Sequence, residues 1–294
     1  MASRDRADPI EGMPVSRHAR LTARILWLWA VCLLVFLYLP IAMLVVLSFN
    51  QGRAVGLPFR GFTLDWYGTA LSNPILMGAV WNTVMVAAIV ALGATVIGTM
   101  AAFPLVRGGI RHPGAARVMA TMPIMLPGML LGLGILIFLR RVLGIDLSLG
   151  TVVVGHLVFT TPFVILIVAA RLQGFDRSLE WAAADLGATP RRTVRHIILP
   201  LIWPAILAGA LISVTLSIDE FIITFFTVGP QMTLPIYIYT QIKFGVTPEV
   251  NAIATLLLVV TLGALLVGAV GVRAARRVRG RSGRVPGPAT DGGP

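Results

Sequence analysis

Long apolar runs dominate the pattern of hydrophobic and polar positions, and six of them reach roughly the 20 residues that a helix needs to cross a membrane. The runs cover residues 25–47, 80–104, 118–139, 151–170, 197–218 (continuing apolar to 228) and 251–272. At about 1.5 Å per residue, each is long enough for a hydrocarbon core of about 30 Å. The pattern predicts an all-α, polytopic membrane protein with six transmembrane helices within residues 25–272.

Prolines and glycines interrupt several of these runs. Membrane helices tolerate such residues where neighbouring helices or a water-lined cavity satisfy the freed backbone groups. The residues concerned are Pro40, Pro123, Pro127, Gly128, Gly132, Gly134, Pro162 and Pro204. We therefore expect a bundle that contains bent helices.

The composition excludes several classes of protein. Of the 294 residues, 57% are hydrophobic and 12% are charged, with a mean hydropathy of +0.88. A soluble domain carries about 25% charged residues, and a single soluble core would not hide this much apolar surface. The net charge of +12 alone would fit nucleic-acid binding, but the apolar content does not, so we expect no nucleic-acid partner. The single cysteine, Cys32, excludes a disulfide framework and a cysteine metal site.

The basic residues predict the orientation of the chain. With both termini cytoplasmic, five of the 24 lysines and arginines fall in outer segments, and these are Arg53, Arg60, Arg140, Arg141 and Lys243. The other 19 lie in inner segments and are interpreted mainly as topological anchors. We expect a multi-pass protein of the plasma (inner) membrane. Residues 1–24 would form a cytoplasmic tail, and residues 273–294 a basic tail near the lipid bilayer that ends in disorder.

The inner loop between the fourth and fifth runs is long and organised. Asp176 or Ser178 is suited to begin a helix, and Gly187 is suited to end it. Thr189-Pro190 then restarts a helix that leads back into the membrane. These signals predict a helix–turn–helix elbow at residues 176–196, apolar on one side and basic on the other. Such an elbow either lies on the lipid surface or docks a partner protein, and these signals do not decide between the two roles.

The residues of the elbow resemble the EAA signature of permease subunits in binding-protein-dependent ABC importers. That signature is Glu-Ala-Ala, three residues, Gly, nine residues and Ile-x-Leu-Pro. Ala182-Ala183, Gly187 and the run from Ile197 to Pro200 match it without a gap. Trp181 occupies the glutamate position, and Glu180 stands one residue earlier, a shift that rotates a helical side chain by about 100°.

This resemblance implies a type I ABC importer permease fold, in which the elbow is the coupling helix that sits in a groove of the ATPase. The implied ATPase-docking residues are Glu180, Trp181, Ala182, Ala183, Asp185, Gly187, Ile197, Leu199 and Pro200. It further implies two ABC ATPase subunits, a second related permease and an external solute-binding protein. Because the chain lacks a G-x-x-x-x-G-K-[ST] loop, we expect the partner ATPase to use the ATP and Mg. We expect no cofactor, metal site or catalytic residue in this chain.

Segments outside the elbow are similar to spermidine/putrescine importer permeases. These segments are residues 62–67, 171–176, 216–219 and 246–252, and they follow the family's order. The similarity implies that the chain moves polyamines, delivered by the solute-binding protein, at the expense of ATP. Relatives in this subgroup carry other solutes, so another small solute is the first alternative.

Asp219 and Glu220 are the only acids within the apolar runs. An acid at the centre of a membrane helix costs about 2.5–3.5 kcal/mol, so it usually faces a cavity or a partner. We hypothesise that Asp219 lies on the substrate path and that Glu220 lies either on this path or at a helix end. Neighbouring aromatic residues would add cation–π contacts, or serve packing and anchoring, and these are Phe221, Phe225, Tyr237 and Tyr239.

Two other functional classes fit the residues less well. A membrane enzyme needs converging nucleophiles or acid–base groups, and the adjacent Asp219–Glu220 pair is the only candidate. His156 and His196 have no second ligand at suggestive spacing and are interpreted as packing or interfacial residues. An ion-coupled secondary transporter would leave the elbow unexplained, and no internal repeat supports it.

Overall fold

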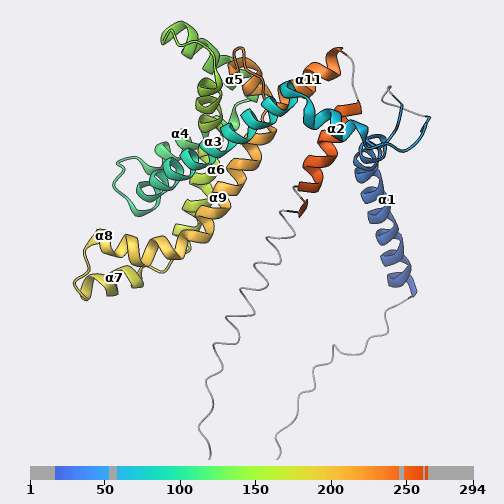
Figure 1. Ribbon diagram of the computed structural model, residues 1–294. Coiled ribbons are helices and arrows are strands. Elements are labelled where there is room, and N and C mark those ends of the chain that lie inside the picture. The colour runs from blue at the N-terminus through green and yellow to red at the C-terminus, as the bar shows by residue number, and fades with distance from the viewer. Residues whose placement is uncertain (1–16, 53–57, 245–247, 261, 264–294) are drawn as a thin grey trace, which may run out of the picture. The chain divides into compact units, whose positions relative to one another are not determined.

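The computed structural model describes residues 17–52, 58–244, 248–260 and 262–263, and these are helical apart from their connections (Figure 1). The longer helices are α1 (Arg17–Leu47), α3 (Pro74–Arg107), α4 (Pro113–Met125), α5 (Gly128–Ile137), α6 (Leu149–Gln173) and α9 (Leu199–Asp219). The shorter ones are α2 (Asp65–Ser72), α7 (Ser178–Asp185), α8 (Pro190–Thr193), α10 (Ile222–Thr227), α11 (Leu234–Phe244) and the π-helical turns η1 (Phe138–Val142) and η2 (Val194–Ile198). Extended pairing in the described part of the chain is limited to one bridge between Asn50 and Phe62, so the all-α prediction is confirmed there.

The chain divides into two compact units, Met1–Tyr67 with Thr247–Pro294 and Gly68–Val246. In the first unit, the end of α1 is tied to the segment before α2. The hydroxyl groups of Ser48 and Tyr67 lie 2.7 Å apart, and the indole of Trp66 donates to the carbonyl of Asn50 at 2.8 Å. These contacts fix the exit of α1, whose own side chains are mostly exposed, as expected of a helix that lies in lipid.

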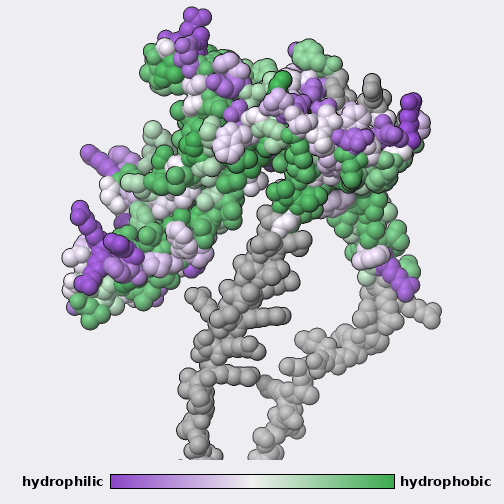
Figure 2. All heavy atoms as spheres, viewed as in Figure 1, coloured by the Kyte–Doolittle hydropathy of each residue, from purple (hydrophilic) through white to green (hydrophobic). Residues whose placement is uncertain are grey.

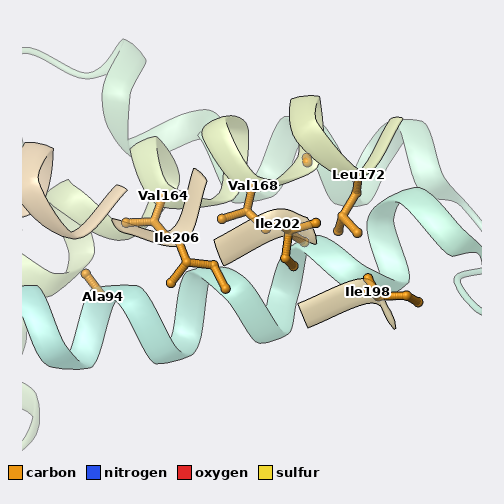
Figure 3. Packing of buried hydrophobic residues seen from close by; sticks show 9 residues of the cluster. Ala94, Val164, Val168, Leu172, Ile198, Ile202 and Ile206 are labelled. Carbon is orange, nitrogen blue, oxygen red and sulfur yellow. The ribbon is translucent and has the colours of Figure 1, made fainter. Parts of the chain in front are cut away.

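The second unit is built around α3, α6 and α9, which share one apolar core (Figure 3). The core residues are Ala94, Ala102, Val164, Val168, Ala169, Leu172, Ile198, Ile202 and Ile206. Small residues allow the close approach: a Cβ added at Gly98 of α3 would lie 2.6 Å from the Cβ of Val164. Backbones that pack this closely are typical of helices that associate in membranes.

Four described helices are long and apolar enough to span a membrane. They are residues Leu21–Leu47, Pro74–Arg107, Leu149–Gln173 and Pro190–Asp219. The pair formed by Pro113–Met125 and Gly128–Val142 adds a fifth if it is counted as one span. The sixth predicted run, 251–272, is described only in part. Residues 251–260 belong to a helix from Pro248 to Val260, and residues 262–263 are also described. Residues 1–16 of the predicted N-terminal tail and all of 273–294 lie outside the described residues.

The third predicted run, 118–139, is not one straight helix, which corrects the sequence-based expectation. The helices on either side of the break are bent by 101°. Pro127 has no N–H to donate and restricts the residue before it, and Leu126 accordingly adopts an extended ψ of 135°. The prolines and glycines in this run were therefore correct signals of a bend, although the run length suggested a single helix.

The fifth run ends as a helix at Asp219, and its apolar continuation to residue 228 forms the separate short helix α10. The break has no proline. Instead Glu220 takes an extended conformation (φ −72°, ψ 105°), and its carboxylate Oε1 accepts the N–H of Ile223 at 2.9 Å. Glu220 therefore starts α10 by supplying an acceptor to one of its first free N–H groups.

Candidate functional site

The predicted elbow, residues 176–196, is present and lies at one end of α9 (Figure 1). It consists of α7, a turn and α8, and η2 continues α8 into α9. Asp176 precedes α7, and its Oδ1 accepts the N–H of Ser178 at 2.9 Å. The hydrogen bonds from the N–H and hydroxyl of Ser178 lower the pKa of Asp176 from 3.8. The hydrogen bonds to the ionised carboxylate of Asp176 therefore stabilise the folded protein above the pKa that this group has in the unfolded chain. This stabilisation is lost as the pH falls through the lowered pKa of the folded state.

Gly187 ends α7 in the left-handed conformation, with a φ of +77°. Its N–H donates to the carbonyl of Ala184, and the N–H of Ala188 donates to the carbonyl of Ala183, both at 2.9 Å. This pair of bonds closes the helix as a Schellman motif and confirms the predicted stop. Thr189 and Pro190 begin α8 as predicted, although the side chain of Thr189 caps no N–H group.

The elbow exposes apolar side chains around a shallow groove. Trp181 is 67% exposed and Leu186 is 89% exposed, whereas Ala183 is buried. The groove has a volume of about 510 Å³ and is lined by Leu179, Ala182, Ala183, Leu186, Ala188, Arg192, Thr193, His196 and Ile197. Figure 2 shows hydrophilic residues gathered at this end of the second unit. An exposed apolar patch rimmed by polar groups is typical of a docking surface.

Three of the predicted docking residues differ from the others in position. Leu199 and Pro200 lie in the first turn of α9, and Leu199 packs against the core of the bundle. Glu180 does not join the exposed apolar face: its Oε1 lies 2.5 Å from Nη2 of Arg107 at the end of α3. In the sequence, Arg107 is one of the 19 inner basic residues that are interpreted as anchors. Its place at the end of a long apolar segment indicated a helix end, but no neighbouring residue in the sequence linked it to the elbow.

The break between α9 and α10 is the second candidate site. Asp219 is exposed, and Glu220 is partly buried because its carboxylate caps α10. Aromatic residues gather beside this break. The ring centroid of Phe221 lies 5.7 Å from that of Phe225 and 5.0 Å from that of Tyr239. Carboxylates and exposed aromatic faces are both groups that attract organic cations, and both occur in the sequence around this break.

Tyr237 is not part of this aromatic cluster, although its place in the sequence suggested a common role with the other three. Its side chain is only 5% exposed. Its hydroxyl accepts from the side-chain amides of Asn73 at 3.4 Å and Gln241 at 2.8 Å. Tyr237 therefore serves packing. Helical positions two residues apart point about 200° away from each other, so Tyr237 and Tyr239 face different sides of α11.

His156 forms a buried polar contact that holds α10 in place. Its Nδ1 lies 2.8 Å from the hydroxyl of Ser217 and its Nε2 lies 2.8 Å from the hydroxyl of Thr224. Thr224 donates its only hydroxyl proton to the carbonyl of Glu220, so His156 must donate to Thr224 through Nε2 and accept from Ser217 at Nδ1. The packing role expected for His156 is therefore to join α6 to α9 on one side of the break and to α10 on the other.

Replacing His156 with alanine is expected to destabilise the protein by about 2–4 kcal/mol, since it leaves a cavity and two buried hydroxyl groups without their partner. Thermal unfolding of the purified protein in detergent would measure this loss. His196→Ala is the matched control, because His196 is exposed and bonds only to a carbonyl one turn away. Equal stability of the two variants would contradict the role of His156.

Other chemistry is sparse in the described part of the chain. Within the described ranges, no three His, Cys, Asp or Glu side chains gather closely enough to hold a metal ion. Among the described residues, the elbow and the break after Asp219 therefore hold the candidate functional residues.

Residues 94–280 match the family described as binding-protein-dependent transport system inner membrane component. The chain belongs to this family. The matched region includes both the elbow and the break after Asp219. Together with the apolar helices, membership identifies the protein as a multi-pass inner-membrane permease of the ABC importer type.

Several relatives of this permease have high sequence identity to it. The putrescine transport system permease protein PotI of Escherichia coli (strain K12) is 39% identical over 244 residues, which cover 81% of this chain and 83% of PotI. The spermidine/putrescine transport system permease protein PotC of the same strain is 39% identical over 251 residues, covering 85% and 94%. PotC of Haemophilus influenzae is 38% identical over 228 residues, covering 77% and 88%.

Solved structures show that the permease shares the type I ABC importer fold. A bacterial ABC transporter involved in the import of the acidic polysaccharide alginate has a TM-score of 0.70 at 15% identity, covering 89% of this chain and 99% of that chain. The MetNI methionine ABC transporter has a TM-score of 0.55 at 22% identity, covering 69% and 96%. At these identities the likeness concerns the fold and not the solute.

Proposed function

We propose that this permease moves polyamines such as spermidine and putrescine across the inner membrane as one subunit of an ABC importer. The identity of 39% to PotC over 85% of the chain is the observation that carries this proposal. Asp219 is exposed and stands two residues before Phe221 of the aromatic cluster, which agrees with a cationic solute.

The complete importer would contain a second, related permease, two ABC ATPase subunits and an external solute-binding protein. ATP and Mg would be used by the ATPases alone. The permease would cross the membrane six times with both termini in the cytoplasm, which puts the elbow on the side where the ATPases work. The apolar groove and Trp181 of the elbow would then sit against the ATPase, and nucleotide-driven closure would move them.

Reconstitution tests the proposed function directly. The complete complex in proteoliposomes is expected to take up labelled spermidine or putrescine only with ATP and the binding protein. Transport of solute by this chain alone would overturn the proposal in favour of a secondary transporter. ATP-dependent uptake of a different solute, without uptake of polyamine, would keep the importer and change its substrate.

Asp219→Asn is expected to lower polyamine uptake by about tenfold, the loss that follows from one charge-assisted hydrogen bond to an ammonium group. Uptake by the reconstituted complex is the measurement, with ATPase activity as a check on assembly. Asp219→Glu is the matched control, because it keeps the charge and should retain most of the uptake. Normal polyamine transport by the asparagine variant in an assembled complex would remove Asp219 from the substrate path.

A further inference from the structure

Two adjacent residues at the start of the elbow signature, Glu180 and Trp181, have different surroundings in this protein. Trp181 stands at the signature's glutamate position and is 67% exposed. Glu180, one residue earlier, is held in an ion pair with Arg107, in which the two side chains are only 25% and 16% exposed. Adjacent helical side chains point about 100° apart, so Trp181 and Glu180 face different surroundings.

Arg107 is held at the end of α3 by more than this carboxylate. Its guanidinium carbon lies 5.4 Å from the ring centroid of Phe175, which fits a cation–π contact. Arg107 is also the basic residue in the last turn of α3, where the helix dipole favours a positive charge. Arg111 in the following loop and Arg117 in α4 are exposed, so simple membrane anchoring does not explain the shielded position of Arg107.

A second contact joins the same two parts of the fold. Nη2 of Arg177, just before α7, lies 3.5 Å from the carbonyl oxygen of Val106 and donates to it. Val106 and Phe175 both pack against the apolar core shared by α3, α6 and α9. By contrast, Ala183 is the only buried residue of α7 itself. Apolar packing therefore holds α7 weakly, and the polar contacts to the end of α3 have a large share in fixing its position.

We propose that the Arg107–Glu180 ion pair is the positioning contact that ties the elbow to α3, so that movement of the elbow by the ATPase is passed to α3. Glu180 is then a positioning residue within the permease and not a contact to the ATPase, and Trp181 takes the ATPase-facing place. This inference rests on the proposed function, since it concerns how the elbow transmits the work of ATP hydrolysis. The pair is partly shielded from water, so salt screens it less than an exposed pair.

The test uses the complete importer in proteoliposomes and compares Glu180→Gln, Arg107→Gln and the exchanged pair Arg107→Glu/Glu180→Arg. Solute-stimulated ATP hydrolysis and uptake by the wild-type complex first establish the proposed function by themselves. Each single variant is expected to lower the number of solute molecules taken up per ATP hydrolysed by about tenfold, while ATPase binding is retained. The exchanged pair is expected to recover at least half of the wild-type ratio. Arg111→Gln removes an exposed arginine from the same loop and is expected to leave the ratio unchanged.

Two results would overturn the inference while the proposed function stands. One is loss of ATPase binding in Glu180→Gln that Arg107→Gln does not share, since this would make Glu180 a direct contact to the ATPase. The other is failure of the exchanged pair to recover coupling although the complex assembles. Spin labels at Leu186 and Arg111, with Cys32 replaced by serine, add a measurement that does not depend on transport. The distribution of distances between the two labels should broaden in the single variants and narrow again in the exchanged pair.

Discussion

Trp181→Ala is expected to weaken binding of the ATPase to the permease by about 30-fold or more, the loss that corresponds to roughly 2 kcal/mol at an interface hot spot. Trp181 is 67% exposed on the elbow, so it offers a large rigid surface that a partner can cover. Tryptophan is among the residues most enriched in such hot spots. Titration of the purified ATPase onto the permease complex in detergent would give the Kd.

Three further variants separate a docking role of Trp181 from a general effect of losing an indole. Trp203→Ala removes a tryptophan that is 52% exposed on α9, away from the elbow, and is expected to leave the Kd unchanged. Trp181→Phe should retain most of the binding, because an aromatic surface remains. Trp181→Glu restores the residue of the family signature and is expected to bind as weakly as the alanine variant. Wild-type affinity in Trp181→Ala would show that the ATPase docks elsewhere.

Much of this fold could be predicted because its signals are local. An apolar run of sufficient length identifies a spanning helix without any knowledge of its neighbours, and α1, α3, α6 and α9 were found in this way. The elbow was also predictable, because Gly187 and Pro190 act on the backbone of their own residues. The same holds for the bend at Pro127, although its angle of 101° depends on packing that the sequence does not state.

The remaining features depend on contacts between residues far apart in the sequence. The break after Asp219 needs no proline, since Glu220 caps α10 and His156 of α6 holds Thr224. An apolar run that continues through residue 228 gives no sign of this. The pairing of Glu180 with Arg107 was equally hidden, because each residue already had another interpretation, Glu180 as an ATPase-docking residue and Arg107 as an anchor. The roles of these polar residues become visible only once the helices that carry them are packed.

Gly98→Ala is expected to destabilise the permease by about 1–3 kcal/mol, the usual cost of forcing extra volume into a packed core. A Cβ at Gly98 would lie 2.6 Å from the Cβ and 2.8 Å from Cγ1 of Val164, and 3.2 Å from the carbonyl oxygen of Thr161. Val164 has no room to retreat, because it is fully buried and a Cβ at Gly209 of α9 would lie only 3.1 Å from its Cγ1. The helices α3 and α6 would have to separate, and thermal unfolding of the purified complex in detergent would measure the loss.

Gly78→Ala provides a matched control in the same helix. An added Cβ there meets no atom within 4 Å, and alanine is a better helix former than glycine, so stability should stay equal or rise by up to about 1 kcal/mol. The double variant Gly98→Ala/Val164→Ala tests the cause, because it removes the contact between the added Cβ and Cγ1 of Val164 and leaves the other two close contacts in place. Its destabilisation is expected to be smaller than the sum of the two single effects by about 1 kcal/mol, since the residues are in direct contact. Simple additivity would show that the cost at Gly98 arises from the atoms that the substitution at Val164 leaves in place, which are the Cβ of residue 164 and the backbone carbonyl of Thr161.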